Sequence, residues 1–356
     1  MKYFLLMCSF GFITSCFAFG LNDFYKYNAK LAQKTDSVYQ TLTKEERVAQ
    51  MIVVAAGRLG QPASVIEQLI TKNKIGGIIL LNGTMQGFTE MKLAYQKLNK
   101  GLPMIFSADA EPSLIAYKIK GSSPVKKANA MLSREEVLTY TEIICKDLKK
   151  IGIQYNYAPV VDMSPNKVVS SRSFGNNADT AQAWAKVFIE TSQKNGIVAT
   201  AKHFPGHGYV VGDTHKQLVY INGEMKEVKN YIPLINSGVI SIMVGHIAVK
   251  NNAKYETNDL PATCSKKMVT GLLKNELNFE GIVITDAMNM GGVVKVPQCE
   301  LKAAQAGCDI ILMPVNAAKA IQDIVNELSI DADFEQQIAA SVKKIIRLKI
   351  CLGLIH

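Results

Sequence analysis

Eight short apolar or β-branched segments recur along the chain, and the longer segments between them show helical periodicity. Apolar runs of this length are typical of strands, and apolar residues spaced three or four apart are typical of amphipathic helices. Strands that are apolar throughout are buried on both faces, as in a parallel sheet. The eight predicted strands are residues 51–55, 77–81, 104–107, 153–158, 197–201, 239–244, 282–285 and 310–313.

Helix start and stop signals lie between these segments. Residues 43–46 (T-K-E-E) and 133–136 (S-R-E-E) have the pattern of capping boxes, and Gly152 follows two lysines as a glycine does just after a helix. Residues 179–195 and 265–277 also have helical periodicity. Eight strands alternating with helices predict an α/β fold, and a single (β/α)8 barrel of the TIM type accommodates all eight strands in one domain.

An open, doubly wound sheet is the alternative fold. Such a sheet usually carries a phosphate-binding G-x-G-x-x-G loop after its first strand, whereas residues 57–60 read G-R-L-G, which we expect to be a plain turn. No linker or low-complexity segment divides residues 21–356, so we predict one domain over that range.

The N-terminal residues 1–20 have the pattern of a signal peptide, with Lys2 before an apolar run that is too short to span a bilayer. Residues 13–16 (I-T-S-C) resemble a lipobox that would lipidate Cys16, whereas Ala18 and Gly20 fit a signal-peptidase site with soluble release. We therefore expect an exported protein, periplasmic or extracellular, that is attached to a membrane only if Cys16 is lipidated.

Composition narrows the classes of function. The 356 residues are 48% hydrophobic and 20% charged, as in a globular protein with a large core, and the formal net charge is +10. The basic residues are scattered and form no stripe interleaved with aromatics, so we do not expect nucleic-acid binding. Five cysteines remain after the signal peptide without framework spacing, and we expect them to be buried thiols.

Ionisable residues follow five of the eight predicted strands. They are Asp109 and Glu111 after the third strand, Asp162 after the fourth, Lys202 and His203 after the fifth, His246 after the sixth and Asp286 after the seventh. Because a barrel gathers the carboxyl ends of its strands at one mouth, these side chains are expected to converge on one site.

The densest chemistry lies in residues 201–215, which hold three of the chain's five histidines. His203, His207, Asp213 and His215 could ligate a metal ion, but their spacing matches no compact metal motif and Lys202 adds a competing charge. In the favoured interpretation, which involves no metal, His215 transfers a proton while Asp213 orients its imidazole. Asp286, directly after an apolar strand, is the candidate nucleophile, with an acidic helix cap as the alternative.

These segments carry a resemblance to a known family. The chain resembles glycoside hydrolase family 3, in its single-domain β-N-acetylglucosaminidase (β-N-acetylhexosaminidase) branch, from about residue 40 to its end. The matching motifs are K-H-F-P-G-H-G at 202–208, D-T-H at 213–215, I-T-D-A-M-N-M at 284–290, R-S-F-G at 172–175, I-G-G-I-I at 75–79 and L-P-A-T at 260–263.

The resemblance implies a retaining, two-step hydrolysis of terminal β-N-acetylglucosaminides that needs no cofactor. Asp286 would attack the anomeric carbon, and His215, oriented by Asp213, would serve as acid and then as base. The residues implied to bind the sugar are Asp109, Arg172, Lys202 and His203. Asp162 and His246 are weaker candidates, since either could simply anchor the end of its strand.

The chain departs from the family in two respects. Many members have D-Q-E-G-G-x-V-x-R after the third strand, whereas residues 109–118 read D-A-E-P-S-L-I-A-Y-K and lack the arginine, leaving Lys118 or Lys120 to supply its charge. The predicted export signal favours peptidoglycan fragments (muropeptides) or other N-acetylglucosaminides outside the cytoplasm as substrates. A phosphorylase of the same scaffold and a non-catalytic glycan-binding protein are the alternative functions.

Overall fold

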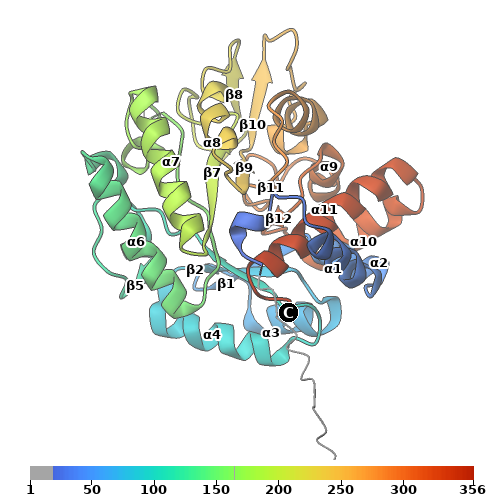
Figure 1. Cartoon of the computed structure of the whole chain (residues 1–356). Helices are drawn as coiled ribbons and strands as arrows, with labels where there is room; N and C mark the ends of the chain where they lie inside the picture. Colours follow the sequence, from blue (N-terminus) through green and yellow to red (C-terminus); the bar gives the residue numbers. More distant parts are fainter. Residues whose placement is uncertain (1–18, 164) are drawn as a thin grey trace, which may run out of the picture.

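The structure is a computed structural model that describes residues 19–163 and 165–356 (Figure 1). Cys16 and most of the predicted signal peptide lie outside the described residues. Eight parallel strands form one sheet in the order β11-β9-β7-β6-β4-β2-β1-β12, with helices around it. The strands are β1 (Ile52–Gly57), β2 (Gly77–Leu81), β4 (Ile105–Ala108), β6 (Tyr155–Asn156), β7 (Val198–Phe204), β9 (Ser241–Val244), β11 (Ile282–Thr285) and β12 (Ile311–Leu312).

A parallel bridge between Ile284 on β11 and Ile310, which directly precedes β12, joins the first and last strands of this order. The barrel is therefore nearly closed. The predicted (β/α)8 barrel is confirmed, and each of its strands overlaps one of the eight predicted segments. The strands are buried along almost their whole length, which explains their continuous apolar sequences. The largest difference is at β7, which continues to Phe204 and thereby includes Lys202 and His203.

The glycines of the I-G-G-I-I motif allow three strands to approach closely. A Cβ at Gly76 would lie 1.9 Å from the carbonyl oxygen of Gln50, and one at Gly77 would lie 2.7 Å from that of Ile105. β2 then pairs in parallel with β1 on one side and β4 on the other. These close contacts at the start of β2 leave no space for a side chain.

The helices surround the sheet, as Figure 1 shows. The α-helices are α1 (Ala29–Gln40), α2 (Lys44–Ala49), α3 (Ala63–Gln68), α4 (Met85–Leu98), α5 (Ile115–Lys118), α6 (Arg134–Ile151), α7 (Ala178–Lys194), α8 (Ile232–Asn236), α9 (Cys299–Ala306), α10 (Ala317–Leu328) and α11 (Ala332–Cys351). The 3-10 helices are η1 (Leu21–Asp23), η3 (Ala128–Ala130), η4 (Ser170–Arg172), η5 (Val228–Asn230) and η6 (Ala262–Cys264). The π-helices are η2 (Leu69–Asn73) and η7 (Lys267–Glu276).

The predicted capping signals are confirmed with one difference. At the start of α2, Thr43 and Glu46 exchange reciprocal hydrogen bonds, as in a capping box. At the start of α6, Ser133 caps the helix, but the carboxylate of Glu136 accepts the N–H of Leu132 instead of that of Ser133. Gly152 ends α6 in a left-handed conformation, and the predicted helix at 265–277 is η7, which has π-type winding.

Two small parallel ladders were not predicted. β8 (Val219–Asn222) pairs with β10 (Ile247–Lys250), and β3 (Gly83–Thr84) pairs with β5 (Ile119–Lys120). The second ladder ties the connection after β2 to the connection after β4.

Two further observations concern cysteines and membrane spans. Cys145, Cys264, Cys299, Cys308 and Cys351 are free and buried, as predicted. Among residues 19–163 and 165–356, no helix combines the length and the apolar character that crossing a membrane requires.

Candidate active site

The carboxyl ends of the strands surround a cavity of about 520 Å³. Its lining includes most of the residues that the sequence singled out, namely Asp109, Arg172, Lys202, His203, His207, His215 and Asp286. Asp213 does not line the cavity but is hydrogen-bonded to His215. The expected convergence of strand ends therefore takes place, as a barrel of parallel strands dictates.

Asp109 lies between two lysines. Its Oδ1 is 2.6 Å from the Nζ of Lys202 on β7, and its Oδ2 contacts the Nζ of Lys118 at the end of α5. Burial raises the pKa of Asp109, but Lys118, Lys202 and Arg172 more than offset this and hold that pKa well below its usual range. Asp109 is therefore an ionised hydrogen-bond acceptor on the cavity wall.

Lys118 lies at the carboxylate of Asp109, where the sequence lacked the family's arginine. Of the two lysines considered for that charge, Lys118 lines this cavity, whereas Lys120 is exposed and lines a neighbouring one. One of the two ammonium groups beside Asp109 thus comes from α5, and the other is that of Lys202 on β7.

Glu111 holds two of the predicted sugar-binding cations. Its Oε2 and Oε1 accept the Nε and Nη2 of Arg172 at 2.8 and 2.7 Å, and the Nζ of Lys202 lies 2.6 Å from Oε1. The carboxylate is fully buried. Burial lowers the pKa of Lys202, yet Asp109 and Glu111 raise it overall, so Lys202 remains a cation inside the barrel. Glu111 is therefore a positioning residue.

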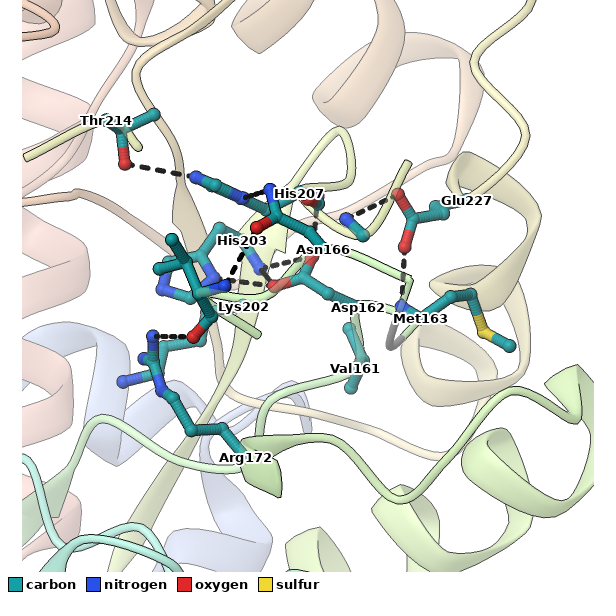
Figure 2. A network of polar contacts seen from close by, with 12 residues as sticks. Val161, Asp162, Met163, Asn166, Arg172, Lys202, His203, His207, Thr214 and Glu227 are labelled. Atoms are coloured by element: carbon teal, nitrogen blue, oxygen red, sulfur yellow. Dashed lines mark hydrogen bonds and ion pairs between the residues drawn. The ribbon is translucent and has the colours of Figure 1, made fainter. Parts of the chain in front are cut away.

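Asp162 organises the base of the histidine-rich loop (Figure 2). Its carboxylate accepts the backbone N–H groups of His203 and His207 and lies 2.7 Å from Nδ1 of His203. Burial raises the pKa of Asp162, and the charge and hydrogen bond of His203 lower it overall. With Nδ1 held by Asp162, the His203 ring presents Nε2 as its other polar atom.

His207 and His246 are two further histidines near the site, and the ring nitrogens of both contact other residues of the protein. His207 contacts Asn166 and Thr214 through its two ring nitrogens, and burial lowers its pKa, so its ring is neutral. The fully buried ring of His246 lies between the hydroxyl of Thr263 and the carbonyl oxygen of Ala287, each at 2.9 Å. His246 thus holds the backbone next to Asp286 and does not line the cavity.

The four residues considered as metal ligands do not share one centre. His203 pairs with Asp162, and Asp213 pairs with His215. Within residues 19–163 and 165–356, no group of three or more His, Cys, Asp or Glu side chains has an arrangement that could hold a metal ion.

Asp213 and His215 form a dyad on the loop after β7. The Oδ1 of Asp213 accepts the Nδ1–H of His215 at 2.7 Å and its backbone N–H at 2.9 Å. Burial raises the pKa of Asp213, and these two hydrogen bonds lower it overall. Because Nδ1 is committed to the carboxylate and the imidazole is 62% exposed, Nε2 is the atom that can exchange a proton.

Asp286 follows β11 and accepts the backbone N–H of Ala287 at 2.8 Å. Burial raises its pKa, but the charges of His203 and His246 and the Ala287 hydrogen bond lower it overall. No helix begins here, since the next one, α9, starts at Cys299. The alternative of a helix cap is therefore wrong, and Asp286 is an ionised carboxylate at the cavity.

The dyad loop is docked on the segment that follows Asp286. The N–H groups of Gly291 and Gly292 donate to the carbonyl oxygens of His215 and Thr214 at 3.0 and 2.9 Å. A Cβ at Gly291 would lie 2.2 Å from the carbonyl oxygen of Lys216, so only glycine permits this approach. The resting position of His215 at the cavity thus depends on these two glycines.

Glu227 is a functional candidate that the sequence did not reveal. Figure 2 shows its carboxylate beside the loop, where it accepts the N–H groups of Met163 (2.6 Å), Gly208 (2.9 Å) and Tyr209 (3.4 Å). Burial and the nearby charge of Asp162 raise the pKa of Glu227 to about 8. No motif marks this residue, because its partners lie 18 to 64 positions away.

Comparisons with known proteins identify the family of the chain. Residues 43–348 match the model of the glycosyl hydrolase family 3 N-terminal domain. The match extends over most of the chain, which therefore belongs to glycosyl hydrolase family 3.

Several relatives within the family are named β-hexosaminidases. The chain is 26% identical to β-hexosaminidase A of Pseudoalteromonas piscicida over 326 residues, which cover 80% of this chain and 54% of that protein. It is 24% identical to the β-hexosaminidase of Glaesserella parasuis, covering 69% of this chain and 76% of that one. The chain spans about half the length of several of the curated relatives that it matches.

Solved structures share the barrel. A family 3 β-N-acetylglucosaminidase from Paenibacillus sp. superposes with a TM-score of 0.78 at 26% identity, over 88% of this chain and 63% of that one. A β-glucoside phosphorylase superposes with a TM-score of 0.83 at 19% identity, over 93% of this chain and 62% of that one. The second similarity concerns the fold alone.

We predict that Gly291→Ala loosens the dyad loop. The added methyl group would collide with the backbone of Lys216, and loss of the two loop hydrogen bonds should speed amide exchange in residues 209–217 and 287–293 by about tenfold. Hydrogen–deuterium exchange with mass spectrometry measures this. Gly271→Ala is the control, because its Cβ would lie 3.7 Å from the nearest atom. Unchanged exchange in the Gly291 variant would contradict the docking role.

We predict that Glu227 makes stability depend on pH. Its pKa rises from 4.5 when unfolded to about 8 when folded. Its contribution is therefore complete below pH 4.5 and is lost as the pH rises towards 8, by up to about 1.4 kcal/mol per pH unit. Urea unfolding at pH 5, 6, 7 and 8 should show this decline in the wild type relative to Glu227→Gln, which cannot ionise. Parallel curves would rule the contribution out.

Proposed function

We propose that this protein is an exported, retaining β-N-acetylglucosaminidase that hydrolyses terminal β-linked N-acetylglucosaminides. One observation carries the proposal, namely that Asp286 and the His215 of the dyad line the same cavity as Asp109, Lys202 and Arg172. A retaining glycosidase needs a carboxylate nucleophile and a proton donor around one sugar site. The β-hexosaminidase names of the relatives support the choice of sugar.

In the first step, the ionised carboxylate of Asp286 attacks the anomeric carbon and the bond to the leaving oxygen breaks. The imidazolium of His215, with Nδ1–H held by Asp213, gives its Nε2 proton to that oxygen. The products are a glycosyl ester on Asp286 and the free alcohol. Asp213 supports this step because its negative charge stabilises the imidazolium.

In the second step, the neutral Nε2 of His215 removes a proton from water, and the resulting hydroxide oxygen attacks the anomeric carbon. The ester bond breaks, which returns Asp286 as a carboxylate and His215 as an imidazolium. The docked loop keeps the imidazole at the cavity for both steps.

The sugar is held by charged partners whose own positions are set by buried carboxylates. Asp109 accepts hydrogen bonds from sugar hydroxyls, and Lys202, Arg172 and His203 complete the set of polar groups around the ring. Glu111 fixes the positions of Arg172 and Lys202. Asp162 fixes the ring of His203. The rigid arrangement lowers the entropic cost of binding.

Peptidoglycan-derived fragments are the substrates that we favour. The predicted signal peptide supports an exported protein, and terminal N-acetylglucosamine outside the cytoplasm occurs in such fragments. Lipidation at Cys16 would attach the protein to a membrane, whereas cleavage after Gly20 would release it.

We predict that Asp286→Ala abolishes turnover but not sugar binding. Release of p-nitrophenol from its β-N-acetylglucosaminide should fall by roughly three orders of magnitude or more, because no ester can form. Calorimetry with N-acetylglucosamine should still detect binding. The control, Asp36→Ala, alters an exposed carboxylate that pairs with Lys343 on the helical surface.

The same assay separates the alternative functions. Stimulation of the wild type by phosphate would assign the protein to the phosphorylases, and sugar binding without turnover would make it a glycan-binding protein. Preference for the β-glucoside would overturn the choice of sugar, and loss of activity with a chelator would indicate a metal.

We predict that the effect of His215→Ala depends on the leaving group. The nitrophenolate leaving group needs little protonation, so the variant should form the glycosyl ester from a nitrophenyl glycoside almost as fast as the wild type does. With a disaccharide, the variant should react roughly 100-fold or more slowly than the wild type, which is the scale of general acid catalysis. Steady-state kinetics with both substrates, with and without azide, measures this. Azide should restore turnover of the nitrophenyl substrate, because it attacks the ester without a base. Equal losses of kcat/KM on both substrates would contradict the acid role, because kcat/KM reports the glycosylation step and not the second step that both substrates share.

A further inference from the structure

The connections that lead into four neighbouring strands of the barrel have charges of one sign. These strands are β2, β4, β6 and β7, which lie next to one another in the sheet. Because parallel strands all begin at one end of a barrel, the four connections lie together at that end, which we call the amino face. Residues 71–76, 97–104, 149–154 and 194–197 include no Asp or Glu and seven lysines, namely Lys72, Lys74, Lys97, Lys100, Lys149, Lys150 and Lys194.

Neighbouring connections in this half of the amino face are in contact. The Nζ of Lys149, before β6, donates to the Oδ1 of Asn195, before β7, at 3.0 Å. A Cβ at Gly101, before β4, would lie 3.0 Å from the Cβ of Lys74, before β2. β4 and β6 pair directly. The lysines therefore belong to one continuous surface, although they are scattered along the sequence.

Most of this positive charge is not compensated within the protein. Lys74 pairs with Glu46, and Lys150 pairs with Asp147. The other five lysines are exposed and form no ion pair with any residue in the described part of the chain. A surface with uncompensated charge of one sign favours contact with a partner of the opposite sign.

The preference of helix ends for lysine does not explain this pattern. Lysine is favoured in the last turn of a helix because the carbonyl groups there have a partial negative charge. However, α8 and α9, which lead into β9 and β12, have no basic residue in their last turns. The connection into β11 instead includes Glu276 and Glu280. The excess of lysine is therefore a property of one half of the amino face.

The N-terminal segment lies on the same face, beside the lysines. Tyr25 donates its hydroxyl to the carbonyl oxygen of Val239, which directly precedes the start of β9, the neighbour of β7. Arg347 on α11 donates to three backbone carbonyl oxygens of residues 23–26. Tyr27 is 92% exposed, and tyrosines are enriched at the level of lipid headgroups in membrane-bound proteins.

The predicted lipidation site is close to this face along the chain. Cys16 is five positions before Leu21, so their Cα atoms are at most about 18 Å apart. A lipid on Cys16 would therefore hold the amino face near the bilayer. Cleavage after Gly20 would leave the attraction between the lysines and anionic lipids as the only contact.

We propose that the lysine-rich half of the amino face lies on an anionic lipid bilayer. This inference rests on the export that is part of the proposed function. The ammonium groups attract the phosphate groups of the lipids, and Tyr27 lies among the headgroups. The candidate active site is at the carboxyl ends of the strands and therefore faces away from the membrane, towards glycans in the surrounding space.

The first test measures binding to lipid vesicles. The exported, processed protein is sedimented with vesicles of phosphatidylcholine alone and with vesicles in which about one third of the lipid is phosphatidylglycerol. We expect a partition coefficient roughly tenfold or more higher on the anionic vesicles at low ionic strength, and added salt should reduce the difference. Equal partition on both kinds of vesicle would overturn the proposal.

A variant of the face removes four of its charges through the changes Lys72→Gln, Lys97→Gln, Lys100→Gln and Lys194→Gln. Its preference for anionic vesicles should fall to within about twofold. The control makes the same change of net charge at exposed lysines that follow β6, β7, β9 and β11, through Lys167→Gln, Lys216→Gln, Lys250→Gln and Lys295→Gln. The control should keep the preference, and thermal unfolding verifies that both variants fold. Equal losses in the two variants would overturn the assignment to this face.

Site-specific labelling tests the orientation. The five native cysteines of the described part are buried, so a cysteine introduced by Lys100→Cys or Lys250→Cys can be labelled selectively with a fluorophore. Brominated lipids should quench the label at position 100, on the amino face, and leave the label at position 250 unquenched. Equal quenching at both positions, or quenching at position 250 alone, would contradict the proposed orientation.

The vesicle measurements separate this proposal from the proposed function because they require no turnover. Equal partition would refute the lipid contact even for an active, exported glycosidase. Cell fractionation tests the export itself, and a protein confined to the cytoplasm would overturn the export and, with it, this inference. Tighter binding to duplex DNA than to anionic vesicles, lost in the variant of the face, would overturn the choice of lipid as the partner.

Discussion

The site depends on one buried cation, the ammonium group of Lys202, which lies between Asp109 and Glu111 inside the barrel. A buried charge is tolerated only when opposite charges compensate it closely, so the ends of β4 and β7 must stay in register. Glu111 extends the constraint to Arg172 on a distant connection. The same contacts therefore hold one wall of the cavity in place and compensate the charge that is buried in the barrel core.

The dyad loop is held at its base and at its tip by groups from other segments of the chain. Asp162 and Glu227 accept backbone N–H groups at its base, and Gly291 and Gly292 donate to its tip. The tip itself carries the dyad of Asp213 and the exposed His215. Hydrogen bonds to backbone fix the path of a loop without restricting its side chains, so the imidazole keeps the freedom that proton transfer requires.

The cavity that Asp109 and Asp286 line differs in electrostatics from the neighbouring cavity that Arg58 and Lys120 line. Each cation of the sugar cavity faces a carboxylate, which suits a neutral ligand with many hydroxyls, whereas Arg58 and Lys120 have no such partner among the described residues. The side chains of Tyr117 and Asn82 line both cavities.

The sequence by itself determined the eight strands and the residues at their carboxyl ends, because periodicity and capping are local and a parallel barrel brings such ends together. It also identified Asp109, Arg172, Lys202, His203, His215 and Asp286, which line one cavity. The roles of Glu111 and Glu227 arise from partners far along the chain, and no local pattern encodes them. Only the tertiary structure could choose Lys118 over Lys120 beside Asp109, exclude a helix cap at Asp286 and dock the dyad loop, because these outcomes depend on distances between segments.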